Sequence, residues 1–204
     1  RSPGATLTIT DENGNIVEQW VSTDQPHVIY GTLQPGKTYT LTETISPDGF
    51  GYSNSITFTV SMDGSVDKVL MVDDETSVSI SKKDITGNAE LPNATLTILD
   101  EAGNVVKDEN GNDLTWTSTD KPHIIKGTLV AGKTYVLREV AAPDGYAYST
   151  DVSFTISTDG RVDIVEMNDD FTRVMIMKYS INGEAAEPLE NAKLQILDKD
   201  KKPV

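Results

Sequence analysis

The chain is built from an internal repeat, and this feature constrains its fold more than any other. Residues 20–74 align without gaps on residues 116–170, at a constant offset of 96 positions. Upstream of this match, Ala5–Ile9 corresponds to Ala94–Ile98 at an offset of 89, so the second copy has seven additional residues around Lys107–Gly111. One period is about a hundred residues, the size of a small domain. The sequence therefore predicts tandem domains of one fold.

A third copy begins near the end of the chain. Val174–Lys178 matches Val78–Lys82, and Asn191–Asp198 matches Asn93–Asp100. No linker rich in Gly, Ser or Pro separates the copies, so we expect consecutive repeats to stack as a stiff rod. The predicted parts are a repeat lacking its first strand at 1–75, a complete repeat at 76–171, and the first strands of a third repeat at 172–204.

Each copy consists of short segments of alternating polarity, which is typical of strands with one buried face. Turn signals separate these segments, among them Asn13-Gly14, Asn110-Gly111 and Asn182-Gly183. No segment has the sustained 3.6-residue period of a helix. Many short strands with frequent turns predict an all-β protein made of tandem Ig-like β-sandwiches.

In three predicted strands an ionisable side chain shares a face with apolar ones, because alternate residues of a strand point the same way. The sets are Val78, Ile80 and Lys82; Tyr135, Leu137 and Glu139; and Val165, Met167 and Asp169. The partial copies hold the equivalents Glu43, Asp73 and Lys178. We therefore expect a lysine, a glutamate and an aspartate where core residues would normally lie.

Two interpretations of these three residues remain open on the sequence alone. In the first they form a buried salt-bridged triad, or lie at strand ends that reach solvent. In the second, Lys82 condenses with Asp169. Desolvation favours the neutral form of the lysine amine, which is the nucleophilic form. It also favours a protonated Glu139, which can polarise the aspartate carbonyl and transfer protons. The product would be an isopeptide bond.

The same residues lie in motifs that resemble the CnaB-type, prealbumin-like (SpaA-like) domains of Gram-positive pilins and surface adhesins. The motifs are Ile80–Asp84, Leu91–Leu96, Gly132–Tyr135, Glu139–Tyr146 and Val165–Asp169, and the resemblance as a whole covers nearly the whole chain. In that family a lysine of the first strand joins an Asn or Asp of the last strand, with a glutamate as catalyst. The resemblance implies an isopeptide bond between Lys82 and Asp169, catalysed by Glu139.

The partner of Lys82 has an alternative in Asn168, which is adjacent to Asp169. Asp169 is favoured because it shares its face with apolar residues, and because the first copy keeps Asp73 but has Val72 in place of the asparagine. Likewise, Lys82 is favoured over Lys83, whose side chain points outward.

Composition excludes several functions. The formal net charge of −15 excludes a nucleic-acid binder that works by neutralising phosphates. The absence of cysteine excludes disulfides and thiol catalysis. No apolar run approaches the length of a membrane span, so we predict no membrane partner.

Other candidate sites are weak. The repeated Asp-x-Pro-His motif holds both histidines, His27 and His123, for which a structural role is favoured. The Asp108–Asn112 segment superficially resembles a calcium loop, but its glycine and its twelfth position do not fit. We therefore predict no metal and no cofactor, and no turnover enzyme beyond a single self-crosslinking event.

Two functions remain. The favoured one is a structural stalk or backbone repeat of a bacterial surface protein or pilus-like fibre, located outside the cell at the surface or cell wall. The alternative is an adhesin module that binds a host matrix protein or a glycan through loops at the sandwich ends. Near-identity of the turns in both copies favours the stalk.

The partners expected are the neighbouring repeats of the same chain and, in a lower-ranked variant, other copies in a fibre. In that variant Lys178 of one chain completes the first repeat of the next chain and bonds to its Asp73. The simpler explanation is that the sequence is a piece of a longer repetitive protein. The second strand expected at Lys193–Asp198 duplicates one already present in the first repeat, which favours this simpler explanation.

Overall fold

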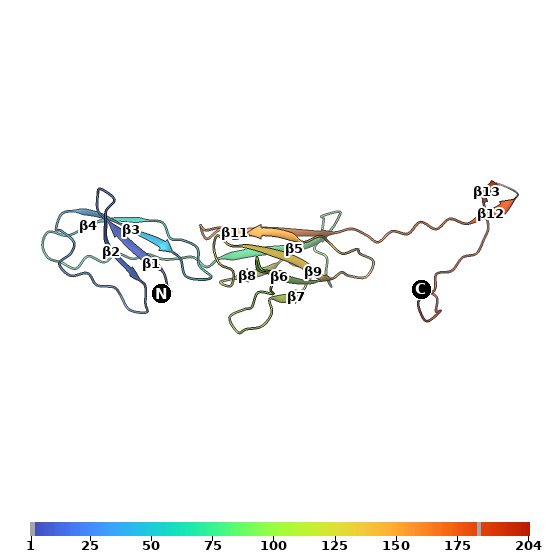
Figure 1. Ribbon diagram of the computed structural model, residues 1–204, viewed down its shortest axis with the longest axis horizontal. Helices are drawn as coiled ribbons and strands as arrows, with labels where there is room; N and C mark the ends of the chain where they lie inside the picture. Colours follow the sequence, from blue (N-terminus) through green and yellow to red (C-terminus); the bar gives the residue numbers. More distant parts are fainter. Residues whose placement is uncertain (1–2, 183–184) are drawn as a thin grey trace. The chain divides into compact units, whose positions relative to one another are not determined.

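The computed structural model describes residues 3–182 and 185–204, in two compact units, Arg1–Phe171 and Thr172–Val204 (Figure 1). All of the regular structure in the described residues is β. The strands are β1 (Thr6–Thr10), β2 (Ile16–Val21), β3 (Thr38–Ile45), β4 (Ile56–Thr59), β5 (Ser77–Asp84), β6 (Thr95–Leu99), β7 (Thr115–Thr117), β8 (His123–Lys126), β9 (Thr134–Ala141), β10 (Val152–Thr155), β11 (Val162–Asp169), β12 (Tyr179–Asn182) and β13 (Ala185–Pro188).

The complete repeat is a two-layer sandwich. One sheet has the order β10-β9-β6-β7 and the other the order β11-β5-β8. In the second sheet β5 is the central strand, parallel to β11 on one side and antiparallel to β8 on the other. The first and last strands of the repeat are therefore direct neighbours.

Alternating polarity along the strands builds the core between these sheets. In β11 every second residue from Val165 onward is buried, and the intervening residues are exposed. Apolar residues from both sheets then form one cluster, to which Val78, Ile80, Leu96, Leu137 and Met167 contribute. This arrangement confirms the prediction of an all-β sandwich.

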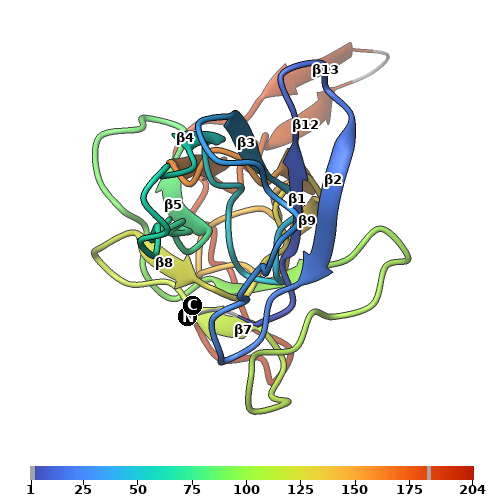
Figure 2. The same ribbon diagram turned by 90° about the vertical axis from the view of Figure 1, so that its left-hand side faces the viewer.

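The first repeat has only the sheet β2-β1-β3-β4, which corresponds to β7-β6-β9-β10 of the complete repeat (Figure 2). Its core consists of Ile9, Tyr39 and Leu41, with partly buried side chains packed against them. The segments equivalent to β8 and β11, residues 27–30 and 66–73, are not in strands. Among the described residues, the complete repeat therefore has seven strands, β5–β11, and the first repeat has four, β1–β4.

Backbone hydrogen bonds join the two repeats without a linker. The Tyr52 amide donates to the Thr158 carbonyl at 2.7 Å, and the Thr76 amide donates to the Gly49 carbonyl at 2.8 Å. The Thr76 hydroxyl also lies 3.2 Å from the Gly49 carbonyl, and within its own repeat it donates to the Leu129 carbonyl at 2.6 Å. Gly49 has a φ of +82°, and a side chain there would collide with the Gly127 carbonyl. The sequence at this junction therefore permits a close approach of the two backbones.

In the described residues of the unit Thr172–Val204, the strands β12 and β13 form a hairpin. The strands expected at 174–178 and 193–198 are absent from its described residues, which is a correction to the sequence prediction. A strand is stable only beside a partner, and the first strand of a repeat needs neighbours like β8 and β11 on both sides. The turn predicted at Asn182-Gly183 includes a residue outside those described.

The hairpin predicted within the seven-residue insertion is present. The Gly111 amide donates to the Asp108 carbonyl at 3.0 Å, and Gly111 has a φ of +81°. No helix in the described part of the chain is long and apolar enough to cross a membrane.

Candidate functional site

Lys82, Glu139 and Asp169 meet inside the complete repeat. Lys82 lies near the end of β5, Asp169 ends β11 beside it, and Glu139 comes from β9 in the opposite sheet. Lys82 and Asp169 are each 1% exposed and Glu139 is 6% exposed. The positions agree with the predicted strand faces, because all three side chains lie among core residues. Their chemical roles stay predictions.

The lysine ammonium contacts both carboxylates. Its Nζ forms an ion pair with Asp169 Oδ1 and lies 3.2 Å from Glu139 Oε1. Asp169 Oδ2 and Glu139 Oε1 are buried and lack a hydrogen-bond partner among the described residues. Two carboxylates facing one ammonium would leave a net negative charge in a dry site, which is unfavourable. A proton on one carboxyl group would remove this excess charge.

Glu139 is the group best placed to hold that proton. Burial raises its pKa, and the nearby Asp169 charge raises it further, while the Ser149 amide and Lys82 act in the opposite direction. The desolvation effect is the largest of these, so the carboxyl group favours its neutral form more than an exposed glutamate does.

Ser149 is a fourth member of the site that we did not single out from the sequence. Its amide donates to Glu139 Oε2 at 2.8 Å, which fixes that carboxyl group. Its hydroxyl contacts Asp169 Oδ1, donates to the Asn168 carbonyl at 2.6 Å, and accepts from Lys82 Nζ at 3.2 Å. The available signal was the alignment itself, since Ser53 lies at the equivalent position of the first repeat.

Asn168 and Lys83, the two alternatives raised by the sequence, lie outside this cluster. The Asn168 side chain is exposed and donates to Glu166 at 3.2 Å. Lys83 pairs with the same glutamate at 2.7 Å. Neither side chain belongs to the buried site.

The first repeat holds the two carboxylates in the same arrangement without a lysine. The Ser53 amide donates to Glu43 Oε2 at 2.8 Å, and the Ser53 hydroxyl contacts Asp73 Oδ1. Glu43 is 5% exposed, and its Oε1 is buried without a hydrogen-bond partner among the described residues. Lys178, the third equivalent, lies in the other unit, where its side chain is exposed.

A sequence model described as SpaA, prealbumin-like fold domain, matches residues 3–75 and again residues 76–170. These matches cover most of the chain. The chain belongs to the family of SpaA prealbumin-like fold domains. Domains of this family suggest a structural part of a pilus or of an extracellular surface protein, and such a role is consistent with a protein that is not an enzyme.

The chain is also similar to several solved structures. The shaft pilin SpaA of Lactobacillus rhamnosus GG is 15% identical, with a TM-score of 0.41 over 85% of this chain and 90% of the pilin. The Bacillus anthracis TIE protein is 24% identical, with a TM-score of 0.43 over 83% of this chain and 31% of that protein. A streptococcal ancillary pilin is 20% identical, with a TM-score of 0.39 over 83% and 58% of the respective chains. No curated protein matches the chain.

The two histidines of this SpaA-family chain pack against tryptophans. His27 stacks on Trp20, and His123 stacks on Trp116, each with ring centroids 4.3 Å apart. Burial lowers the pKa of His123, which favours its neutral form. This packing supports the structural role that the sequence favoured.

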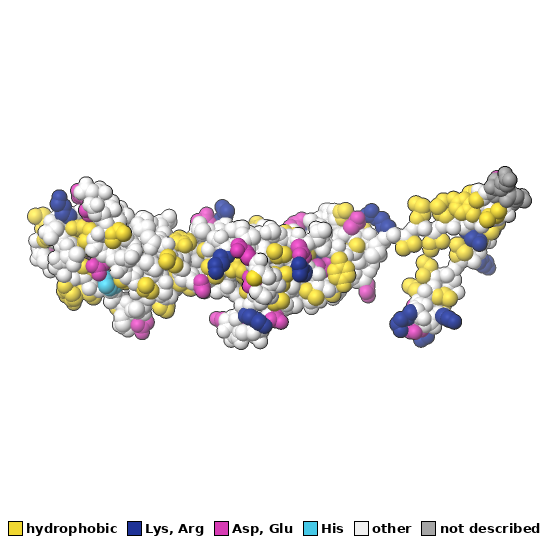
Figure 3. Space-filling model, in the orientation of Figure 1, with side chains coloured by type: hydrophobic (Ala, Val, Ile, Leu, Met, Phe, Trp, Pro, Cys, Tyr) yellow, Lys and Arg dark blue, Asp and Glu magenta, His cyan; other side chains and the backbone are white. Residues whose placement is uncertain are grey.

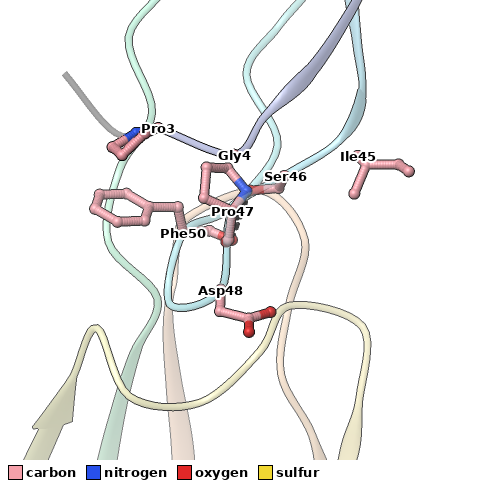
Figure 4. A pocket seen from close by; sticks show the side chains of 7 residues that line it. All are labelled: Pro3, Gly4, Ile45, Ser46, Pro47, Asp48 and Phe50. Carbon is pink, nitrogen blue, oxygen red and sulfur yellow. Dashed lines mark hydrogen bonds between the residues drawn. The ribbon is translucent and has the colours of Figure 1, made fainter. Parts of the chain in front are cut away.

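A surface hollow lies at one end of the first repeat, beside the turn that follows β3, and neither Glu43 nor Asp73 lines it. Pro3, Pro47 and Phe50 contribute apolar surface to it, whereas the Asp48 carboxylate points away from these rings (Figure 4). The Ser46 hydroxyl is used within the turn, where it donates to the Phe50 and Gly51 carbonyls at 2.9 Å. The hollow therefore offers few polar groups that converge on a ligand.

Proposed function

We propose that the complete repeat is a self-crosslinking stalk domain of a bacterial surface protein or pilus-like fibre, in which Lys82 and Asp169 form an isopeptide bond. The observation that carries this proposal is the buried cluster of one ammonium and two carboxylates. An ordinary core would avoid that combination, because buried ions seldom add net stability. A reaction that consumes both charges accounts for it.

The chemistry requires only groups that the site holds. Lys82 passes a proton to a carboxylate in the dry interior, which leaves a neutral amine. Its Nζ attacks the Asp169 Cγ while protonated Glu139 donates toward the developing oxyanion. The C–N bond forms, the C–O bond to one carboxyl oxygen breaks, and one water leaves with that oxygen and two protons. The product is a neutral amide.

The strand order explains what the bond would contribute to a stalk. β5 and β11 are the first and last strands of the repeat and lie side by side in parallel. A crosslink between residues 87 positions apart would stabilise the repeat by roughly 4–5 kcal/mol through loss of chain entropy in the unfolded state. Tension applied at both ends would pass from one strand to the other through the covalent bond, and the sandwich would not need to unfold.

Intact-mass measurement followed by peptide mapping tests the proposal. The expected mass is lower than the sequence mass by one water for the complete repeat, with the Lys82 and Asp169 peptides joined. Glu139→Ala should restore the full mass, while the control Glu166→Ala, which changes an exposed carboxylate, should keep the deficit. Loss of ammonia with a joined Asn168 peptide would instead identify the asparagine as partner, and full mass in the unmodified chain would refute the bond.

The adhesin alternative receives less support. The hollow at the end of the first repeat is open to solvent, and its turn uses the Ser46 hydroxyl internally. Ligand-binding sites normally combine enclosure with a few convergent polar groups. We therefore propose spacing and mechanical strength as the role of these repeats, and extracellular attachment at the cell surface as their setting.

A further inference from the structure

The strand β5 loses one of its two neighbours before it reaches the reacting lysine. β8 pairs with β5 from Ser77 to Ile80, where Ile80 lies opposite His123. On the other edge β11 continues alongside β5 as far as Asp84. The backbone of Lys82 therefore needs hydrogen-bond partners other than β8, because buried backbone groups are almost always paired.

The segment that follows β5 supplies these partners. The chain turns after β5, where the Gly87 amide donates to the Asp84 carbonyl at 2.9 Å, and then returns beside the strand. There the Leu91 amide donates to the Lys82 carbonyl at 2.6 Å. The Lys82 amide donates to Glu90 Oε2 at 3.0 Å. A side-chain carboxylate thus takes the place of a strand carbonyl, and an ionised acceptor forms a stronger hydrogen bond than a neutral one.

Glu90 differs in its setting from the charged groups at the surface of the complete repeat. Figure 3 shows charged side chains of both signs next to each other on that surface. Lys83 pairs with Glu166 there, and Arg138 pairs with Asp151. Such exposed pairs contribute little to stability. Glu90, in contrast, is partly buried, and its carboxylate is bonded to the backbone of the reacting lysine.

We propose that Glu90 is a positioning residue for the condensation, because its carboxylate fixes the backbone of Lys82 and so holds Nζ against the Asp169 carboxyl group. The inference rests on the proposed function, since it concerns the same reaction. Glu90 acts through the Lys82 backbone and not on the reacting atoms. It is therefore distinct in role from Glu139, which contacts the lysine Nζ.

The length of the lysine side chain explains why its backbone must be fixed. Four flexible carbons separate Nζ from the backbone, so Nζ is held in one place only if both ends of the side chain are held. Asp169 and Glu139 contact the Nζ end, and the Leu91 amide and Glu90 hold the backbone end. A misplacement of about 1 Å can slow a reaction between positioned groups about a hundredfold.

The surroundings of Glu90 determine which substitutions are informative. Glu90 lines a hollow of about 50 Å³ with the stacked rings of Trp116 and His123, and Ile80 and Lys82 reach the same hollow from β5. Glu90→Ala removes the acceptor and enlarges the hollow. Glu90→Leu removes the acceptor but keeps a side chain of similar size, and Glu90→Gln keeps both an acceptor oxygen and the size. The three variants therefore separate the hydrogen bond from packing.

The rate of bond formation in the full chain tests the inference. The chain is made by cell-free translation, synthesis is stopped, and mass spectra at intervals give the fraction that is short by one water. Glu90→Ala and Glu90→Leu should both react roughly tenfold to a hundredfold more slowly than the unmodified chain, and Glu90→Gln should restore the rate. Asp163→Ala is the matched control, because the Asp163 carboxylate accepts from the Ser157 amide at 2.7 Å near the other end of β11. It should keep the unmodified rate.

Amide hydrogen exchange provides a readout that a general loss of stability would not reproduce. It is measured in a Glu139→Gln background, in which the bond is not expected to form. Glu90→Ala should speed exchange at the Lys82 amide, while the Ile80 amide, in the part of β5 paired with β8, should keep its protection. Tryptophan fluorescence verifies that each variant is folded, since a folded chain that is merely less stable reacts at an unchanged rate.

The outcomes separate this inference from the proposed function. Unchanged rates in Glu90→Ala and Glu90→Leu would overturn the inference and leave the bond itself in place. A rate restored by leucine, or not restored by glutamine, would also overturn it, because the acceptor oxygen would then not be the cause. Equal slowing in Asp163→Ala would overturn it as well, since the effect would not be specific to Lys82. An unmodified chain that never loses water would overturn both proposals.

Discussion

The first and the complete repeat show the same sequence pattern with and without a central strand. His123-Ile124-Ile125-Lys126 forms β8, while the equivalent His27-Val28-Ile29-Tyr30 forms no strand. Residues 162–169 form β11, while residues 66–73 do not. The other sheet is conserved in both repeats, strand for strand. Local sequence therefore does not decide whether these segments become strands.

The difference shows that the other two strands of the second sheet depend on β5. It provides the hydrogen-bonding edge for β8 and β11 at once, and these two strands do not pair with each other. Without β5 both lose their partner together, because a strand needs a ladder on at least one side. The carboxylates behave differently: Ser53 and Ser149 hold them in the same way in both repeats. The contacts that hold the carboxylates therefore do not require the central strand.

The largest loss of stability is expected from Lys82→Ala, which leaves the complete repeat with two buried carboxylates and no lysine, as in the first repeat. The variant should show no loss of water, and its two buried carboxylates should lack a cation. Removing one partner of a buried pair costs about 3–5 kcal/mol, and the absent crosslink costs roughly 4–5 kcal/mol more. Denaturant unfolding measures the sum. Lys83→Ala is the matched control, because Lys83 pairs at the surface, and a similar loss in that variant would show that the buried site is not responsible.

Much of this comparison was predictable from the sequence, for physical reasons that can be named. The period-2 alternation placed Lys82, Glu139 and Asp169 on core faces, because a single-residue shift would have buried Lys83, Arg138 and Asn168 instead. The turn glycines followed from Asn-Gly pairs. These are local rules that act within one strand or one hairpin.

The rest depended on partners distant in sequence. The alternation in 66–73 and 174–178 matches that of true strands, yet neither segment forms one. Ser149 was missed for a related reason, since a serine after a Gly-Tyr turn has no pattern of its own. Its importance comes from three groups on other strands that meet at its hydroxyl.

Glu139→Gln should lower the free energy of unfolding less than Lys82→Ala does. This variant tests the catalytic role of Glu139 while the Lys82–Asp169 ion pair stays in place. The amide can still accept from the Ser149 amide, so the fold should persist. The bond should not form, because an amide cannot exchange the proton that the reaction needs. We expect full mass and a loss of about 4–5 kcal/mol from the missing crosslink alone. Normal crosslinking in this variant would eliminate Glu139 as the catalyst.

Ser149→Ala should slow the reaction without preventing it. The serine hydroxyl contacts both reacting groups, whereas the amide that fixes Glu139 belongs to the backbone and remains. Loss of one hydrogen bond to a charged group corresponds to about a tenfold slower reaction. The rate follows from mass spectra taken at intervals after refolding, with the exposed Ser153→Ala as control. An unchanged rate of bond formation would show that the Ser149 hydroxyl has only a packing role. The crosslinked product should be the same whether or not the rate changes.

The smallest effect concerns the pH dependence of the first repeat. Burial raises the pKa of Glu43, so the free energy of unfolding should be highest below the pKa of the unfolded glutamate and should fall as pH rises through the folded value. Asp11, Asp63 and Asp67 have lowered pKa values, and their contribution is complete above about pH 5 and lost only in stronger acid.

Between mildly acidic and neutral pH, Glu43 should therefore dominate the change. A Trp116→Phe background leaves Trp20 as the only tryptophan, so fluorescence reports the first repeat alone. The melting temperature should decrease from pH 4.5 to pH 7.5, and Glu43→Gln should flatten this dependence. The complete repeat should show the same direction once its bond has formed, because Glu139 keeps its buried carboxyl group and loses the Lys82 charge that lowers its pKa. A first repeat whose stability rises across this range would contradict the assignment of Glu43 as a buried carboxyl group without a cation beside it.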